Sequence, residues 1–294
     1  MKILITGANG LLGQKIVKHL NKQKVDFLAT SLDENRNSKC SSSNYKTLDI
    51  TDDLAIKKIV DSYKPTHIIN TAAITNVDFC EDNQQLCQKV NVEAVKLLFE
   101  VCKQNNCHFI HLSTDFVFDG KNGPYKETDT PNPLSVYAKS KYKSEQILLN
   151  DDYKNWAILR TIIVYGQGEN LSRSNIVLWA KEALENKQSL TIVDDQFRAP
   201  TWADDLAWAC IKTAKIKARG IFHISGPKTM SIYEIVKQIA EFYGYNSSLI
   251  TPIKSDTLNQ KAPRPPKTGF ILDKAKTDLG YNPKLFKETL KLIK

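Results

Sequence analysis

Short, almost continuously apolar segments alternate with amphipathic segments through the first two-thirds of the chain. Apolar segments of this length are typical of strands buried on both faces, and the longer segments with apolar residues every three or four positions are typical of helices. Strands are predicted at residues 2–6, 25–30, 45–50, 67–73, 108–114, 156–161 and 220–225. Helices are predicted at residues 11–21, 52–63, 86–105, 137–149, 176–185 and 203–214. The alternation predicts an α/β fold, a doubly wound parallel sheet of the Rossmann type.

The regular alternation ends after Val164, where the loop-like segment YGQGENLSRSN begins. Residues 1–162, completed by 203–225, are predicted to form a dinucleotide-binding Rossmann domain. Residues 163–202 and 226–294, which include the proline-rich APRPPK, are predicted to form a smaller C-terminal substrate-binding lobe. Ligands of open α/β sheets bind outside the carboxyl ends of the strands. We therefore expect the lobe to close over that edge.

Composition narrows the choice of partners. The chain has 294 residues, 41% of them hydrophobic, and a net charge of +9, but its lysines are spread along helices rather than interleaved with aromatic residues. This pattern favours anionic small molecules over nucleic acid. With no apolar run of about 18 residues and no leader-like N-terminus, we expect no membrane association and a cytoplasmic protein. The six cysteines and five histidines lack metal-ligand spacing, so reduced thiols and no metal are expected.

A glycine-rich turn, GANGLLG, follows the first predicted strand and precedes the first predicted helix. Gly7 suits the tight turn, Gly10 lets a pyrophosphate approach the backbone, and Gly13 allows the helix to pack closely on the strand. The helix N-terminus then faces the phosphates with unpaired N–H groups. The coenzyme-binding residues predicted at this turn are Gly7, Asn9, Gly10, Leu11, Leu12 and Gly13.

The end of the second predicted strand, ATSLDENR, bears on the choice of coenzyme. Ser31 is small and polar, and Arg36 and Lys39 follow within reach of a 2′-phosphate, which favours NADPH. Asp33 could instead bind the ribose hydroxyls of NADH. NADPH and NADH both remain candidate coenzymes.

Tyr137 and Lys141 are four residues apart on a predicted helix and therefore share one face. A neighbouring ammonium is expected to lower the pKa of the phenol and to make it a usable proton donor. Upstream, a strand ends in STDFVFDG and presents Thr114 at the sheet edge, where a hydroxyl can bind a substrate carbonyl. These parts predict a reductase in which Tyr137 protonates the carbonyl oxygen while hydride reaches the carbon.

GxxGxxG, a strand-end hydroxyl and YxxxK in this order resemble the extended short-chain dehydrogenase/reductase family. The segments STDFVFDG, NTAAITNVDFCEDN, LRTIIVYG, VDDQFRAPTWADDLA and GIFHISG resemble, more narrowly, its dTDP-4-dehydrorhamnose reductase branch. The resemblance implies NAD(P)H-dependent reduction of a 4-keto-6-deoxy nucleotide-sugar, with dTDP-4-dehydro-L-rhamnose as the leading candidate. A homodimer formed through helices 86–105 and 137–149 is possible by the same analogy.

The resemblance also implies roles for single residues. Thr114 would bind the substrate carbonyl beside Tyr137, and Lys141 would bond the nicotinamide ribose. Asn91 would be structural or part of a proton relay. Further coenzyme contacts are implied for Asp49, Ile50, Ala72 and Ala73. Substrate contacts are implied for Thr75, Val77, Asp115, Phe116, Asn175, Arg198, Thr201 and Trp202.

Two residues depart from the family pattern, and two alternative functions remain open. Phe116 stands where the branch often has Tyr, and Arg198 where it often has Gly, so the sugar identity is less defined than the chemistry. Asp115 beside the hydroxyl leaves room for a nucleotide-sugar epimerase or dehydratase with retained NAD. A non-catalytic dinucleotide-binding regulatory subunit is the second alternative.

Overall fold

A seven-stranded, all-parallel sheet forms the centre of the protein in the computed structural model, which describes residues 1–293. The strand order is β11-β6-β5-β4-β1-β2-β3. The strands are β1 (Lys2–Thr6), β2 (Asp26–Ser31), β3 (Tyr45–Thr47), β4 (His67–Asn70), β5 (His108–Thr114), β6 (Trp156–Thr161) and β11 (Gly220–Ile224). The order reverses between β1 and β4, where a doubly wound sheet opens a binding crevice. The predicted fold class is confirmed.

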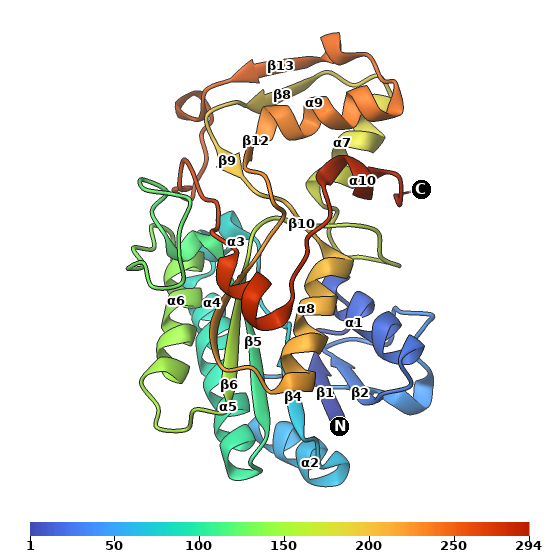
Figure 1. The fold of residues 1–294 in the computed structure, drawn as a ribbon, viewed down its shortest axis with the longest axis vertical. Coiled ribbons are helices and arrows are strands. Elements are labelled where there is room, and N and C mark those ends of the chain that lie inside the picture. Colours follow the sequence, from blue (N-terminus) through green and yellow to red (C-terminus); the bar gives the residue numbers. More distant parts are fainter. Residues whose placement is uncertain (294) are drawn as a thin grey trace.

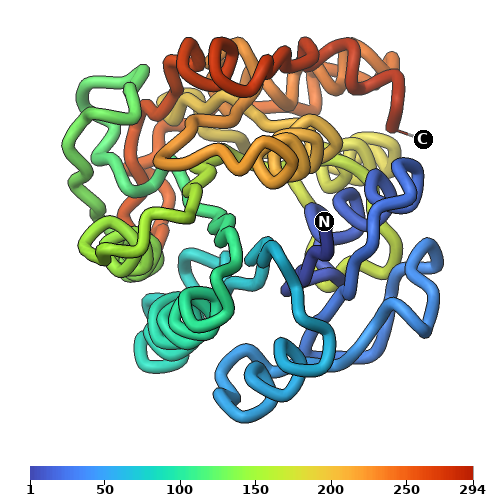
Figure 2. Tube along the Cα trace, turned by 60° about the horizontal axis from the view of Figure 1, so that its bottom comes forward, coloured from blue at the N-terminus to red at the C-terminus, as the bar shows by residue number. Residues whose placement is uncertain are grey.

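Helices cover both faces of this sheet. Helices α1 (Leu11–Lys22) and α8 (Ala203–Ile216) pack on one face. Helices α2 (Asp53–Tyr63), α5 (Ala94–Gln104) and α6 (Val136–Leu149) pack on the other. Figure 2 shows this layering, with light-blue α2 and teal α5 on the side opposite to orange α8. Alternate strand residues face opposite layers: Ile5 joins the cluster with α1, and Leu4 joins the cluster with α5.

The helix predicted over residues 86–105 is interrupted. The structure has α3 (Val77–Asp82), α4 (Gln84–Gln88), a π-helical turn at Lys89–Glu93 and then α5. Asn91 lies in the π-helical turn, accepts a hydrogen bond from Ile74 N at 2.8 Å and donates one to Ile74 O at 3.0 Å. A π-helical turn locally re-aims side chains, and here Asn91 holds the loop after β4. Asn91 was expected to be structural or part of a proton relay, and these two hydrogen bonds support the structural role.

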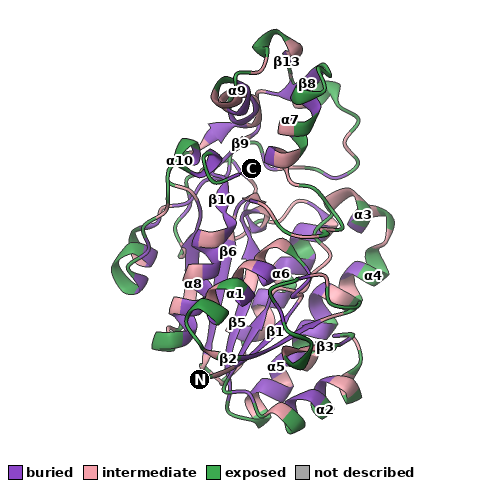
Figure 3. Cartoon of the chain, turned by 90° about the vertical axis from the view of Figure 1, so that its right-hand side faces the viewer, coloured by how far each residue is buried: buried purple, intermediate pink, exposed green. Residues whose placement is uncertain are grey.

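A smaller lobe lies beyond the carboxyl ends of the strands, at the top of Figure 1. Its helices are α7 (Ile176–Glu185), α9 (Ile232–Tyr243) and α10 (Phe286–Leu290). Its paired strands are β8 (Leu190–Val193) with β13 (Ile250–Ile253), β9 (Phe197–Arg198) with β12 (Met230–Ser231), and β7 (Val164–Tyr165) with β10 (Thr201–Trp202). Figure 3 shows buried residues gathered between these helices and strands and exposed residues on their outer faces. The lobe therefore has an apolar core of its own.

The boundary predicted for the C-terminal part needs refinement. Phe270, Leu272, Ala275 and Leu279 belong to the same apolar cluster as α1 and α8. This segment therefore returns to the central sheet before α10 rejoins the lobe. Within residues 1–293 no helix is long and apolar enough to cross a membrane. All six cysteines are buried free thiols, and within the same residues no cluster of three or more His, Cys, Asp or Glu could hold a metal ion.

A buried ion pair joins α6 to β6. Arg160 donates from Nε to Glu145 Oε1 at 2.9 Å and from Nη2 to Glu145 Oε2 at 2.6 Å. The side chains of Glu145 and Arg160 are 0% and 1% exposed. Removing one partner of such a pair leaves a buried charge without compensation, although the pair as a whole adds little net stability. The pair therefore fixes where α6 sits on the sheet.

Glu145→Ala is expected to lower the free energy of unfolding by roughly 3–5 kcal/mol, because Arg160 is then left charged and buried. The double variant Glu145→Ala/Arg160→Met is expected to recover much of this loss. Urea unfolding at neutral pH measures both. A loss below about 1 kcal/mol for Glu145→Ala would contradict a fully buried pair.

Candidate active site

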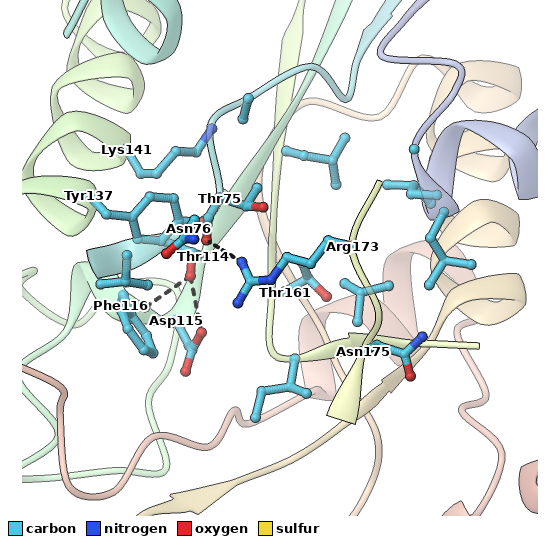
Figure 4. Close-up of a pocket in the computed structure, with 18 of the residues that line it drawn as sticks. Thr75, Asn76, Thr114, Asp115, Phe116, Tyr137, Lys141, Thr161, Arg173 and Asn175 are labelled. Carbon is cyan, nitrogen blue, oxygen red and sulfur yellow. Dashed lines mark hydrogen bonds between the residues drawn. The ribbon is translucent and has the colours of Figure 1, made fainter. Parts of the chain in front are cut away.

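A cavity of about 750 Å³ lies between the carboxyl edge of the sheet and the small lobe. This volume is in the range of small-molecule sites. Its walls include the glycine turn after β1, the loop after β4, the end of β5, the start of α6 and the segment before α7. Figure 4 shows side chains from these elements pointing into the same space. The cavity thus lies at the edge of the sheet where the strand order reverses, and the predicted Thr114, Tyr137 and Lys141 line it.

The glycine turn has the geometry that a pyrophosphate requires. Gly7 has φ of +71°, and a Cβ there would lie 2.7 Å from Ala72 N. A Cβ on Gly13 would lie 2.5 Å from Gly7 O. Gly10 precedes α1 without a side-chain cap, so the first N–H groups of the helix remain available toward the cavity. The turn therefore fits the phosphates of a dinucleotide.

Of the coenzyme residues predicted at the turn and after β4, Gly7, Gly10, Leu11, Leu12, Gly13, Ala72 and Ala73 line the cavity. Asn9 instead supports the neighbouring loop: it donates to Glu34 O at 2.8 Å and accepts from Arg36 N at 3.0 Å. Its contribution is to shape the segment after β2.

The charges after β2 neutralise each other. Arg36 forms an ion pair with Asp33, and Tyr45 donates to Asp33 O. Arg36, which could bind a 2′-phosphate, and Asp33, which could bind ribose hydroxyls, are therefore paired with each other. Ser31, Arg36, Asp49 and Ile50 are outside the lining of the cavity, so their coenzyme contacts remain predictions.

The start of α6 places Tyr137 and Lys141 on the cavity wall. Ser135 caps this helix by accepting a hydrogen bond from Ala138 N at 3.2 Å. Glu81 of α3 adds a second contact, because its Oε1 accepts from Val136 N at 2.8 Å. Figure 4 shows Tyr137 and Lys141 extending side by side from the helix into the cavity, with the Tyr137 ring next to Thr114 at the end of β5. The structure therefore brings the three predicted catalytic side chains together.

Burial sets the protonation of these groups. It raises the pKa of the Tyr137 phenol, an effect that a hydrogen bond with Thr114 partly offsets and the charge of Asp115 reinforces. The net shift of the phenol pKa is therefore upward, because burial outweighs any lowering by Lys141. Burial also lowers the pKa of Lys141 to about 8, against the opposing effects of Glu145 and Cys87. A phenol that keeps its proton is the form that can act as an acid.

Asp115 joins the catalytic hydroxyl to the small lobe. Its Oδ1 accepts from Thr114 Oγ1 at 3.1 Å, and its Oδ2 accepts from Thr268. Arg198 Nε lies 3.7 Å from the same Oδ2. Burial raises the pKa of Asp115, whereas Arg198 and the two hydroxyls lower it. The carboxylate is therefore already engaged within the protein.

Arg198 lines the cavity, but most of its N–H groups contact oxygens of the protein itself. Its guanidinium donates to Phe197 O and Pro265 O, both at 2.7 Å, and lies 5.3 Å from the centre of the Phe116 ring. Arg198 and Phe116, the two residues that depart from the family pattern, therefore contact each other. Arg198 holds the segment around Pro265 against the site, so a direct substrate contact has less support than the sequence suggested.

The other predicted substrate contacts divide into two groups. Thr75, Val77, Asp115, Phe116 and Asn175 line the cavity. Asn175 also caps α7 by accepting from Val177 N at 3.2 Å. Thr201 and Trp202 lie behind the wall: Thr201 is fully buried and donates to Ile162 O at 2.6 Å, and Trp202 packs on Tyr165. The predicted contacts of Thr201 and Trp202 with substrate are corrected to a structural role.

Two arginines that sequence reasoning missed face the cavity. Arg173 lies in the loop before α7, and its Nη1 is 3.5 Å from Thr75 O. Arg264 pairs with Asp78 at 2.6 Å and lies in the APRPPK segment. Gln196, Gln260 and Asn76 also line the wall. Basic residues in loops of the predicted lobe were the available signal, but only the fold places them on the wall shared with Thr114, Tyr137 and Lys141.

The chain matches the family model described as RmlD substrate binding domain over residues 1–293. It is 34% identical to dTDP-4-dehydrorhamnose reductase of Aggregatibacter actinomycetemcomitans, covering 100% of this chain and 98% of that protein. It is 32% identical to methionine adenosyltransferase 2 subunit beta of Danio rerio, covering 90% and 80%.

The structure also resembles that of dTDP-4-dehydrorhamnose reductase from Bacillus anthracis in complex with NADP. The TM-score is 0.85 at 26% identity, and the match covers 99% of this chain and 98% of that one. The sequence match and the shared fold agree with the glycine turn and the Thr114, Tyr137 and Lys141 arrangement. The chain belongs to the RmlD substrate-binding-domain family, within the extended short-chain dehydrogenases/reductases.

Proposed function

We propose that this protein catalyses the NAD(P)H-dependent reduction of a 4-keto-6-deoxy nucleotide-sugar, with dTDP-4-dehydro-L-rhamnose as substrate and dTDP-L-rhamnose as product. One observation carries the proposal: Thr114, Tyr137 and Lys141 share the wall of a cavity that also contains the glycine turn. The relatives named dTDP-4-dehydrorhamnose reductase and dTDP-4-keto-6-deoxy-D-glucose reductase support the same reaction class.

The coenzyme, when bound, supplies the hydride. The protein supplies the proton and orients the keto group. Tyr137 donates its phenolic proton to the carbonyl oxygen. Thr114, whose hydroxyl hydrogen is donated to Asp115 in the free protein, would turn that hydrogen to the same oxygen. The ammonium of Lys141 stabilises the negative charge that develops on the phenol. Burial of all three side chains limits water at this point and strengthens these interactions.

The positive charge of the cavity wall supports a nucleotide-sugar as the substrate. A nucleotide-sugar carries a diphosphate, and arginine is well suited to bind phosphate oxygens. Arg173 and Arg264 lie on the cavity wall, and the chain has a net charge of +9. We propose that these two arginines hold the diphosphate while the keto group faces Tyr137.

The epimerase or dehydratase alternative has weaker support. A dehydratase needs an acid beside the sugar, and Asp115 is the available carboxyl group. Both of its oxygens are engaged by hydroxyls, and Arg198 lies beside it. The regulatory-subunit alternative is raised by methionine adenosyltransferase 2 subunit beta, but the complete set of Thr114, Tyr137 and Lys141 favours an enzyme.

The proposal also covers the roles of the two domains, the oligomeric state and the location of the protein. Residues 1–162 and 203–225 would bind the coenzyme, and residues 163–202 with most of 226–294 would bind the sugar. A homodimer formed through α4, α5 and α6 is included, since Leu86 on α4 is 45% exposed. We also propose a cytoplasmic location, where reduced nicotinamide coenzymes are regenerated.

The first test is oxidation of NADPH and of NADH with a panel of nucleotide-sugars. We expect stoichiometric consumption of coenzyme with dTDP-4-dehydro-L-rhamnose, followed by the absorbance of the reduced nicotinamide. Coenzyme that copurifies and is not consumed would favour an epimerase or dehydratase. Absence of turnover together with a stoichiometric partner in a pull-down would favour the regulatory subunit.

Tyr137→Phe is expected to reduce kcat by roughly 10²–10⁴-fold, because the proton donor is removed while the ring remains. Coenzyme binding, followed by fluorescence, is expected to persist. Tyr142→Phe on the same helix is the matched control and should leave kcat unchanged. Equal activity of Tyr137→Phe and the wild-type enzyme would reject the proton-donor role.

Arg173→Ala and Arg264→Ala are each expected to raise KM for the nucleotide-sugar by roughly tenfold or more, the scale of one hydrogen bond to a charged group. KM for the coenzyme should stay constant. Lys261→Ala is the control, since Lys261 lies in the same segment and pairs with Asp82 outside the cavity lining. If the Lys261 and Arg264 variants behave alike, a specific diphosphate contact is excluded.

A further inference from the structure

Residues 167–174, which we call the strap, form a loop between β7 and α7 whose two ends lie close together. Asn175 Nδ2 donates to Gly166 O at 2.8 Å and so joins the base of the loop. Every residue of the strap is at least partly exposed. A compact surface loop of this kind has few buried contacts of its own, so its position depends on what its tip binds.

Gln14 of α1 binds the tip of the strap to the predicted coenzyme domain. Gln14 Nε2 donates to Glu169 O, and Glu169 N donates to Gln14 Oε1, both at 2.7 Å. Nε2 also donates to Asn9 O of the glycine turn at 3.0 Å. The amide nitrogen has two hydrogens, so the three bonds form together. Gln14 is only 5% exposed, which limits competition from water.

A second contact joins the tip of the strap to the segment after β2. Glu169 Oε2 accepts from Ser38 N at 2.7 Å, and its Oε1 accepts from Ser38 Oγ at 2.8 Å. These two hydrogen bonds lower the pKa of Glu169, so the carboxylate is ionised and the contact persists at neutral pH. Because this contact is exposed, we expect it to contribute less than the buried amide of Gln14.

The body of the strap crosses the cavity. Leu171 and residues 172–174 line the same cavity as the glycine turn. Arg173 Nη1 donates to Thr75 O of the loop after β4 at 3.5 Å, and Figure 4 shows this side chain extending from the strap toward Thr75. The strand order reverses between β1 and β4. The strap therefore joins the two sides of the crevice in which a dinucleotide would lie.

We propose that the strap is a gate for the coenzyme and that Gln14 is the positioning residue that holds it closed through the backbone of Glu169. A dinucleotide enters or leaves when these contacts break and the strap turns about its base at Gly166 and Asn175. Arg173 moves with the strap, so closure also places this arginine in the cavity. The inference rests on the dinucleotide binding in the proposed function and is independent of the sugar.

A gate of this kind has a characteristic effect on coenzyme kinetics. The contacts of Gln14 and Ser38 with the strap join the protein only to itself, so they form with and without coenzyme. Weakening them raises the open fraction of both states by the same factor, and kon and koff rise together while Kd stays constant. A side chain that only shapes the binding surface would change koff and Kd instead.

Stopped-flow fluorescence of NADPH, with NADH in parallel, measures both rates in the purified full chain. Gln14→Leu removes both hydrogen bonds to Glu169, and we expect kon and koff each to rise roughly tenfold, the scale of two neutral hydrogen bonds. Glu169→Ala keeps the backbone pair with Gln14 and should raise both rates by a smaller factor. The control is Gln23→Ala, an exposed position at the other end of α1, which should change neither rate.

A rise in koff alone, with a weaker Kd, would mean that Gln14 only supports the glycine turn through Asn9, and the gate would be rejected. Unchanged rates in both variants would reject it as well. Hydrogen exchange of the strap amides gives a measurement without coenzyme: exchange should be faster in Gln14→Leu than in the wild-type protein, and equal exchange would overturn the proposal. If Gln14→Leu does not fold, kon and koff of Glu169→Ala must still rise together.

The outcomes for the gate and for the proposed reaction are separable, because neither rate requires a nucleotide-sugar. If NADPH binds but no nucleotide-sugar is reduced, the proposed reaction fails and the two rates still decide whether the strap is a gate. If a nucleotide-sugar is reduced while kon is unchanged in both variants, only the gate fails. If neither NADPH nor NADH binds, both proposals are wrong.

Discussion

The bidentate ion pair between Glu145 and Arg160 holds α6 on the sheet at a point that water does not reach. Its consequence extends one helical turn back, to Lys141. Glu145 uses both oxygens on Arg160, so Lys141 is buried without an ion-pair partner of its own. Burial lowers the pKa of Lys141 to about 8, although the charge of Glu145 opposes this shift.

Charged groups around Asp115 are also paired within the protein. Asp115 lies between Thr114 of the central sheet and two groups of the small lobe, Thr268 and Arg198. It orients the catalytic hydroxyl and ties the lobe to the sheet edge in one contact. Arg198 in turn holds carbonyl groups of the segment around Pro265. Asp115 and Arg198 are thus used to assemble the cavity. Arg173 and Arg264 also face it, Arg264 while paired with Asp78.

These features give the phenol and the amine distinct roles. Tyr137 keeps its proton because burial disfavours the phenolate, which suits an acid that releases the proton only as charge develops on a substrate oxygen. In the proposed reaction, Lys141 would carry the charge that stabilises the resulting phenolate. Contacts through His111, Asn70 and Thr6 link this lysine to β5, β4 and β1. The rigid sheet rather than a mobile loop therefore positions the site.

The sequence by itself determined the doubly wound sheet, the glycine turn and the grouping of Thr114, Tyr137 and Lys141. Each depends on local rules: apolar strand patterns, backbone space at glycine, helical spacing and the meeting of parallel strand ends at one edge. Only the tertiary structure decided which polar groups pair with one another. Arg198, Thr201 and His111 carry side chains that sequence reasoning could name but not place, since their partners lie in distant segments. Burial and pairing are properties of the assembled interior, and for that reason the direction of the Tyr137 pKa shift was not predictable from its spacing to Lys141.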